Sequence, residues 1–180
     1  MEMQSTRVIA APPAAVWEAL NDPEALKASI PGCESFIRES DTQWRAVVAA
    51  KVGPVSARFT GAIELADVVA PTRYTLRFQG QGGAAGFANG EARVELSPAA
   101  GGRTSLAYTA KAQVGGKLAQ IGSRLIDGVA AKMADEFFER FAGRFAPVTA
   151  PAAHAAPHFP RWLVALAIAT IVVTGWLLRG

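Results

Sequence analysis

Six stretches of the chain alternate apolar and polar residues at every second position, and this pattern constrains the fold more than any other feature. The stretches are 33–40, 43–52, 55–67, 73–80, 87–97 and 103–114. In 73–80, for example, Tyr74, Leu76 and Phe78 alternate with polar residues. Successive side chains of a strand point to opposite faces, so the pattern gives each strand one apolar face. With short turn sequences between the stretches, it predicts an antiparallel sheet covered on one side. Residues 3–10 are a plausible additional first strand.

The alternation ends at Gly115-Gly116, and the spacing of apolar residues then becomes helical. Seven apolar residues recur at steps of three or four: Leu118, Ile121, Leu125, Val129, Met133, Phe137 and Phe141. This stripe predicts one helix over 117–143, about 40 Å long. Two short helices are expected before it, over 13–21 and from Pro23 to about residue 29, each opened by a proline. The predicted fold is therefore α+β: a curved seven-stranded antiparallel sheet around a long C-terminal helix, in a helix-grip arrangement that fills residues 1–145.

A bent sheet and a long helix do not pack flat against each other, so an apolar cavity is expected between them. Many of the inward positions carry small residues, which fit either close backbone packing or space for a ligand. The candidate lining residues are Phe59, Gly61, Phe78, Phe87, Tyr108, Ala110, Ile121, Gly122, Leu125 and Val129.

The glycine-rich segment 80–90, with Gly82, Gly83 and Gly86, joins two predicted strands. Glycine tolerates backbone conformations that other residues avoid. Two interpretations remain open: a plain hairpin connection, or a mobile loop at the mouth of the cavity.

Residues that would carry catalysis are missing from the predicted domain. Both histidines, His154 and His158, lie beyond residue 145, which excludes a Ser-His-Asp or Cys-His mechanism within it. Their spacing suits a metal only on a helix, and Pro157 disfavours one. The segment 80–86 superficially matches a dinucleotide-binding motif, but it leads into a strand instead of a helix. Cys33 has no neighbouring base in sequence. We expect no catalytic residues, no metal site and no enzymatic activity.

The last twenty residues predict a membrane anchor. Residues 162–178 contain no charged side chain, and a helix of this length measures roughly 25 Å, close to the hydrocarbon thickness of a bilayer. Trp162 and Trp176 are placed for the two interfaces, and Arg161 and Arg179 for the headgroups. A buried core helix is the alternative, but the segment is apolar on all faces. Residues 146–160 are rich in proline and alanine, which is typical of a semi-rigid linker, and they precede the anchor at 161–180.

Composition and charge limit which partners and which cellular compartment are expected. Arg161 and Arg179 are two of the 18 basic residues, which leaves 16 against 15 acidic ones in 1–160, without a basic patch. Nucleic-acid binding is therefore not expected. A single cysteine excludes an internal disulfide and suits a reducing compartment. The first residues lack the pattern of a secretory signal. We expect a single-pass C-terminal anchor in the cytoplasmic membrane, with the domain facing the cytoplasm.

Three segments carry a resemblance to a known family: Ile30-Pro31-Gly32-Cys33-Glu34, the glycine-rich 80–90, and 113–127. Together they resemble the CoxG family of carbon monoxide dehydrogenase subunits, which belongs to the START/Bet v 1-like (SRPBCC) superfamily. The resemblance covers about residues 3–145, and many family members also carry a hydrophobic tail.

The resemblance implies a non-catalytic accessory protein that recruits carbon monoxide dehydrogenase, or a related molybdenum hydroxylase, to the cytoplasmic membrane. The superfamily binds apolar ligands in its helix-grip cavity, so a quinone (menaquinone or ubiquinone) or another lipid is the expected ligand. Two alternatives stay open. One is a pure membrane tether without a ligand, and the other is a cyclase- or aromatase-like enzyme that uses Tyr74 or Tyr108.

Overall fold

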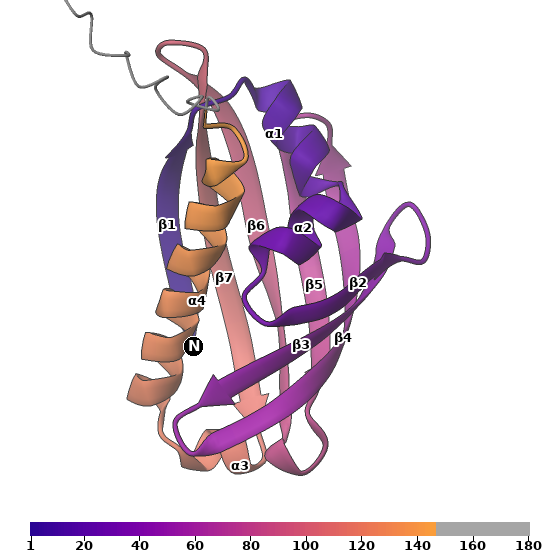
Figure 1. The fold of residues 1–180 in the computed structure, drawn as a ribbon, viewed down its shortest axis with the longest axis vertical. Helices are drawn as coiled ribbons and strands as arrows, with labels where there is room; N and C mark the ends of the chain where they lie inside the picture. Colours follow the sequence, from indigo (N-terminus) through magenta and orange to yellow (C-terminus); the bar gives the residue numbers. More distant parts are fainter. Residues whose placement is uncertain (147–180) are drawn as a thin grey trace, which may run out of the picture. The chain divides into compact units, whose positions relative to one another are not determined.

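The predicted sheet is present in the computed structural model, which describes residues 1–146 (Figure 1). Its seven strands are antiparallel, in the order β1-β7-β6-β5-β4-β3-β2. Every strand end lies within two residues of the predicted position. The strands are β1 (Glu2–Ile9), β2 (Cys33–Arg38), β3 (Gln43–Val52), β4 (Val55–Val69), β5 (Arg73–Gln81), β6 (Phe87–Ala99) and β7 (Arg103–Gly115).

The helices follow the α+β plan, with one correction to the long C-terminal helix. Two short helices, α1 (Pro13–Leu20) and α2 (Pro23–Ser29), stand between β1 and β2, and a 3-10 turn, η1 (Gly83–Ala85), joins β5 to β6. The single helix predicted over 117–143 is wrong, because the chain forms a short α3 (Lys117–Gln120) and then α4 (Ser123–Gly143). Gly122 separates them with a φ of +97°, a conformation outside the helical region that glycine adopts without a steric penalty.

The core lies where α1, α2 and the C-terminal half of α4 cover the inner face of the sheet. Ile9, Val16, Leu106 and Phe141 are almost completely buried there. The buried Thr104 hydroxyl on β7 donates a hydrogen bond of 2.6 Å to the Ala11 carbonyl, just before α1. A second buried cluster joins β2 and β3 and consists of Phe36, Trp44 and Ala46. Leu26 of α2 and Leu65 of β4 pack against both clusters, so the two clusters meet on the covered side of the sheet.

The segment between α2 and β2 passes very close to strand β3. Gly32 has a φ of +71°. The Ala49 amide donates to the Gly32 carbonyl at 2.9 Å. A Cβ atom at position 32 would collide with the Ala49 carbonyl oxygen. Glycine is therefore required here both for its backbone conformation and for the close approach that places α2 over the sheet.

The predicted linker beyond residue 146 and the predicted anchor at 161–180 lie outside the described residues. Residues 1–146 form one compact unit. Within that unit, no helix combines the length and the apolar character needed to cross a membrane.

Candidate functional site

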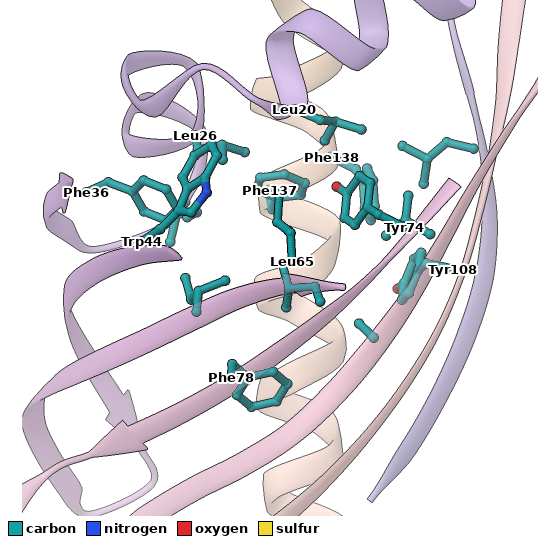
Figure 2. A pocket seen from close by; sticks show the side chains of 16 residues that line it. Leu20, Leu26, Phe36, Trp44, Leu65, Tyr74, Phe78, Tyr108, Phe137 and Phe138 are labelled. Atoms are coloured by element: carbon teal, nitrogen blue, oxygen red, sulfur yellow. The ribbon is translucent and has the colours of Figure 1, made fainter. Parts of the chain in front are cut away.

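An apolar cavity of about 330 Å³ lies between the inner face of the sheet and the helices (Figure 2). The period-2 pattern of the strands builds it, because residues at alternate positions of β4, β5, β6 and β7 turn to the same side. Strands β2 and β3 add Phe36 and Trp44, and α1, α2 with its C-terminal end, and α4 contribute the remaining wall. The lining residues are Leu20, Leu26, Ile30, Phe36, Trp44, Ile63, Leu65, Tyr74, Leu76, Phe78, Ala92, Val94, Leu106, Tyr108, Phe137 and Phe138.

Three of these lining residues carry a polar side-chain atom, and none is charged. The three are Trp44, Tyr74 and Tyr108. Tyr74 is 5% exposed, and its burial raises the pKa of the phenol above its ordinary value. A deprotonated phenol would leave a charge in an apolar site. The Tyr74 hydroxyl therefore stays neutral at physiological pH and is able to donate a hydrogen bond.

The indole ring of Trp44 is held in place on strand β3. Phe36 packs edge-on against it, with ring centroids 5.2 Å apart and planes at 73°. The Arg38 guanidinium lies over the ring, 5.7 Å from its centroid. Trp44 is 2% exposed, and its Nε1 atom is buried without a hydrogen-bond partner among the described residues. In Figure 2 this nitrogen lies on the side of the ring that faces the middle of the pocket.

Aromatic side chains from α4 form the opposite wall. Phe138 stacks on Tyr108 of β7, with centroids 5.3 Å apart, and Phe137 packs edge-on against Phe138 at 5.0 Å. An ion pair between Arg7 of β1 and Asp135 of α4 lies beside this wall, and the Arg7 guanidinium is 5.6 Å from the centroid of the Phe138 ring. The helix therefore presents flat apolar rings to the cavity and is tied to the edge of the sheet.

A second apolar cavity of about 190 Å³ lies toward the N-terminal half of α4. Its lining residues are Met1, Val52, Phe59, Phe78, Ala88, Ala112, Val114, Leu118, Ile126, Val129, Ala130 and Met133. Phe78 lines both cavities. A Cβ atom at Gly90 on the neighbouring strand would lie 2.1 Å from the Lys111 carbonyl oxygen of β7 and 2.9 Å from the tip of the Phe78 ring, so the missing side chain makes room for both. The Phe78 ring is thus the side chain shared by two apolar chambers.

The predicted lining residues are divided between several places. Phe78 and Tyr108 line the first cavity, and Phe59 and Val129 line the second. Gly61 and Ala110 are half-buried in the sheet and line neither of the two.

The remaining predicted lining residues lie near the end of the sheet that carries α3. Leu125 is 43% exposed, and Leu125 and Ile121 lie over the β3–β4 turn at Gly53. Gly122 is exposed, and Phe87 is 38% exposed against Gly115. The break at Gly122 leaves Ile121 and Gly122 outside both helices, and Leu125 lies in the first turn of α4, over the β3–β4 turn.

The glycine-rich loop is compact. The Gly82 amide donates to the Gly86 carbonyl at 2.7 Å, and Ala85 between them is 7% exposed. Side chains at Gly82 or Gly86 would collide with Phe59 or with the backbone of β7. None of Gly82, Gly83 and Gly86 lines either apolar cavity, although the loop adjoins residues of the second. The glycines allow this loop to pack tightly against its neighbours.

Several lining residues were not among the sequence candidates, notably Trp44, Leu65, Phe137 and Phe138. The signal for Trp44 was available, since Trp44 and Ala46 lie two residues apart in the alternating stretch 43–52 and therefore share one face of β3. Phe137 belonged to the predicted helical stripe. Phe138 lies outside that stripe, so the sequence contained no signal for it. Two adjacent helix residues both face the sheet here because the sheet wraps around the helix.

Outside the cavities, two kinds of reactive site are relevant in the described residues: a metal-binding cluster and the Cys33 thiol. Within residues 1–146, no group of three or more His, Cys, Asp or Glu side chains is placed to hold a metal ion. Cys33 donates a weak hydrogen bond of 3.4 Å to the Ser35 carbonyl. Partial burial raises the pKa of this thiol, which disfavours the reactive thiolate.

Comparison with solved structures shows the fold. A conserved protein from Geobacillus kaustophilus is 32% identical, with a TM-score of 0.76, over 81% of this chain and 95% of that one. A START superfamily protein from Mycobacterium smegmatis is 17% identical, with a TM-score of 0.60, over 80% and 96%. An aromatase/cyclase from a Streptomyces species is 14% identical, with a TM-score of 0.61, over 81% and 93%. The last two similarities concern the START/Bet v 1-like fold alone.

Comparison with curated proteins finds no match. The family model for the carbon monoxide dehydrogenase component CoxG matches residues 6–145, which is nearly the whole of the compact unit that contains the sheet, the helices and both apolar cavities. The chain therefore belongs to the CoxG family of carbon monoxide dehydrogenase subunits and has its START/Bet v 1-like fold.

Proposed function

We propose that this protein is a tail-anchored adaptor that carries a quinone or another apolar lipid and docks an oxidoreductase at the cytoplasmic membrane. The observation that carries the proposal is the apolar cavity of about 330 Å³, whose lining contains no charged side chain. Its volume lies in the roughly 300–1,000 Å³ range of small-molecule sites. The domain serves as a holder for a neutral apolar molecule.

A quinone such as menaquinone or ubiquinone suits the walls of this cavity. Its flat ring can stack between aromatic side chains, and Phe137, Phe138 and Tyr108 offer such surfaces. Trp44 and Tyr74 add hydrogen-bond donors for a carbonyl oxygen. A quinone is also the electron acceptor found in membranes, which connects the cavity to the anchor predicted at 161–180.

The family name supports the docking part of the proposal. It denotes a component of carbon monoxide dehydrogenase, so the partner is carbon monoxide dehydrogenase or a related molybdenum hydroxylase. In this function the anchor and linker keep the domain at the membrane, and the domain brings the hydroxylase close to the quinone pool. The protein itself performs no catalytic step.

Organic extraction of the purified full-length protein tests the ligand part. We expect a quinone or lipid in the extract of the wild type by mass spectrometry, in near-stoichiometric amount. Ala92→Phe places a ring in the first cavity and is expected to lower that amount severalfold. Ala88→Phe, in the wall of the second cavity, is the matched control. Wild-type protein that yields no lipid and takes up none of several added quinones would leave only a membrane tether.

Co-purification tests the docking part separately. Membranes that contain the full-length protein are expected to retain the hydroxylase, whereas membranes without it release the enzyme to the soluble fraction. Equal retention in both preparations would contradict the adaptor function, whatever the cavity holds.

A cyclase- or aromatase-like activity is the second candidate, because Tyr74 and Tyr108 bring two hydroxyls into the cavity. These phenols are the only lining groups able to relay protons, and Phe138 stacks on Tyr108 as in ordinary core packing. Turnover of a polyketide substrate that is lost on Tyr108→Phe would favour this function over the adaptor.

A further inference from the structure

Trp44 presents an unpaired hydrogen-bond donor to the first cavity. Among the described residues, its Nε1 atom has no partner, although Trp44 is 2% exposed. A buried donor without an acceptor costs roughly 1–3 kcal/mol. Phe36, its neighbour in the wall, packs edge-on against the ring and Arg38 lies over it, so the indole cannot swing out of the wall without losing both contacts. The N–H group is therefore held in position toward the cavity while lacking an acceptor.

We infer that Trp44 is the recognition residue of the cavity and that its Nε1–H donates to a carbonyl oxygen of a neutral ligand. This inference rests on the proposed function and deepens it, because it names the ligand group, a carbonyl oxygen, that the Trp44 Nε1–H group binds. Trp44 is the only lining residue with a side-chain N–H group. A ligand carbonyl at this point removes the cost of the unpaired donor. A plain hydrocarbon would leave that cost in place.

The same lining excludes charged headgroups. A carboxylate or phosphate in this cavity would be buried beside hydrocarbon and three neutral polar groups, with no cation in the wall. Arg38 lies over the Trp44 ring but is not a lining residue, and its guanidinium pairs with Asp41 at 3.5 Å. The cavity therefore selects neutral carbonyl compounds, such as quinones, over fatty acids of similar size.

Three probes and two variants test the assignment in the full-length protein. The probes are decylubiquinone, which has carbonyls and a chain, dodecylbenzene, which lacks an acceptor, and palmitate, which is anionic. Trp44→Phe keeps an aromatic ring and removes the N–H group. Trp17→Phe is the matched control, since Trp17 packs on Tyr74 outside the lining. Binding is measured by ligand retention, and the carbonyl stretch of bound decylubiquinone is recorded by infrared difference spectroscopy.

We expect Trp44→Phe to bind decylubiquinone about tenfold more weakly, with no comparable change for dodecylbenzene. One carbonyl stretch should lie at lower frequency in the wild type and in Trp17→Phe than in Trp44→Phe. Palmitate should bind the wild type more weakly than decylubiquinone.

Two results would overturn the inference in distinguishable ways. Equal decylubiquinone affinity and an unchanged carbonyl stretch in Trp44→Phe would remove the role of Trp44 and leave the proposed function standing. Wild-type protein that binds none of the three probes would overturn both, because the cavity would then hold no such ligand.

Discussion

Gly32 shows how one residue can decide where a helix lies on this sheet. Its φ of +71° and its close approach to the Ala49 carbonyl bring the end of α2 against β3. Leu26 and Ile30, from α2 and its end, then reach the wall of the first cavity. The glycine in the Ile-Pro-Gly-Cys segment is thus a structural requirement of the cavity, although Gly32 itself is not a lining residue.

Gly32→Ala is expected to destabilise the protein by about 2 kcal/mol more than Gly102→Ala. Gly102 has a similar φ of +68°, so both variants carry the left-handed penalty of about 1–2 kcal/mol. A Cβ at Gly102 meets nothing within 4 Å, whereas a Cβ at Gly32 meets backbone that cannot move independently. Urea unfolding of both full-length variants measures the difference. Equal losses would mean that the contact with Ala49 relaxes without cost.

Tyr74 links the stability of the domain to alkaline pH. Because its pKa is raised in the folded state, the unfolded chain releases the phenol proton first, near the ordinary value of about 10. The contribution to stability is therefore complete below pH 10 and is lost as the pH rises above it. Between pH 8 and 11 the wild type should lose about 1.4 kcal/mol relative to Tyr74→Phe. Parallel unfolding free energies of the two proteins over this range would contradict the burial of a neutral phenol.

At the scale of elements, strand β5 contributes to the walls of both apolar cavities. Tyr74, Leu76 and Phe78 turn inward from it; all three line the first cavity, and Phe78 also lines the second. Gly90 on β6 leaves the space that the Phe78 ring occupies. Phe78 is therefore the one side chain of β5 that the two cavities share.

Phe78→Ala is expected to join the cavities and to shift binding toward ligands with longer chains. Leu76→Ala, two residues earlier on β5, enlarges only the first cavity and is the matched control. Both variants should lose about 2–5 kcal/mol of stability, because each leaves a void. Native mass spectrometry with ubiquinones of two and ten isoprene units measures the preference. The same chain-length preference in both variants would show that the cavities stay separate without the Phe78 ring.

At the scale of the whole molecule, the predicted anchor and the folded domain are separate in sequence. The compact unit covers residues 1–146, and the predicted anchor begins at residue 161. Deleting 161–180 should therefore move the protein from the membrane fraction to the soluble fraction. Its urea unfolding midpoint should not change, because the deleted residues lie outside the compact unit.

Deleting 147–160 is the control for this truncation, since it shortens the chain but keeps the anchor. This variant should stay in the membrane fraction. A protein that remains bound to membranes after loss of 161–180 would show that the domain itself binds lipid.

The sequence alone determined the strands of this protein, its two short N-terminal helices and two residues of the first cavity, Phe78 and Tyr108. Alternation is a local property of extended backbone, so residues such as Phe78 and Tyr108 could be assigned to the inner face from their parity. The break at Gly122 was harder to foresee, because a glycine is tolerated in many helices at a small cost.

Only the tertiary structure decided which inward residues share a cavity. Trp44 and Phe137 are distant in the chain, and they line one pocket because the sheet curves around α4. Leu125 belongs to the same helical stripe as Phe137, yet it lies exposed over a hairpin turn. Periodicity specifies the face on which a side chain lies, whereas a cavity depends on the distances between faces. Those distances are set by the packing of segments that are far apart in sequence.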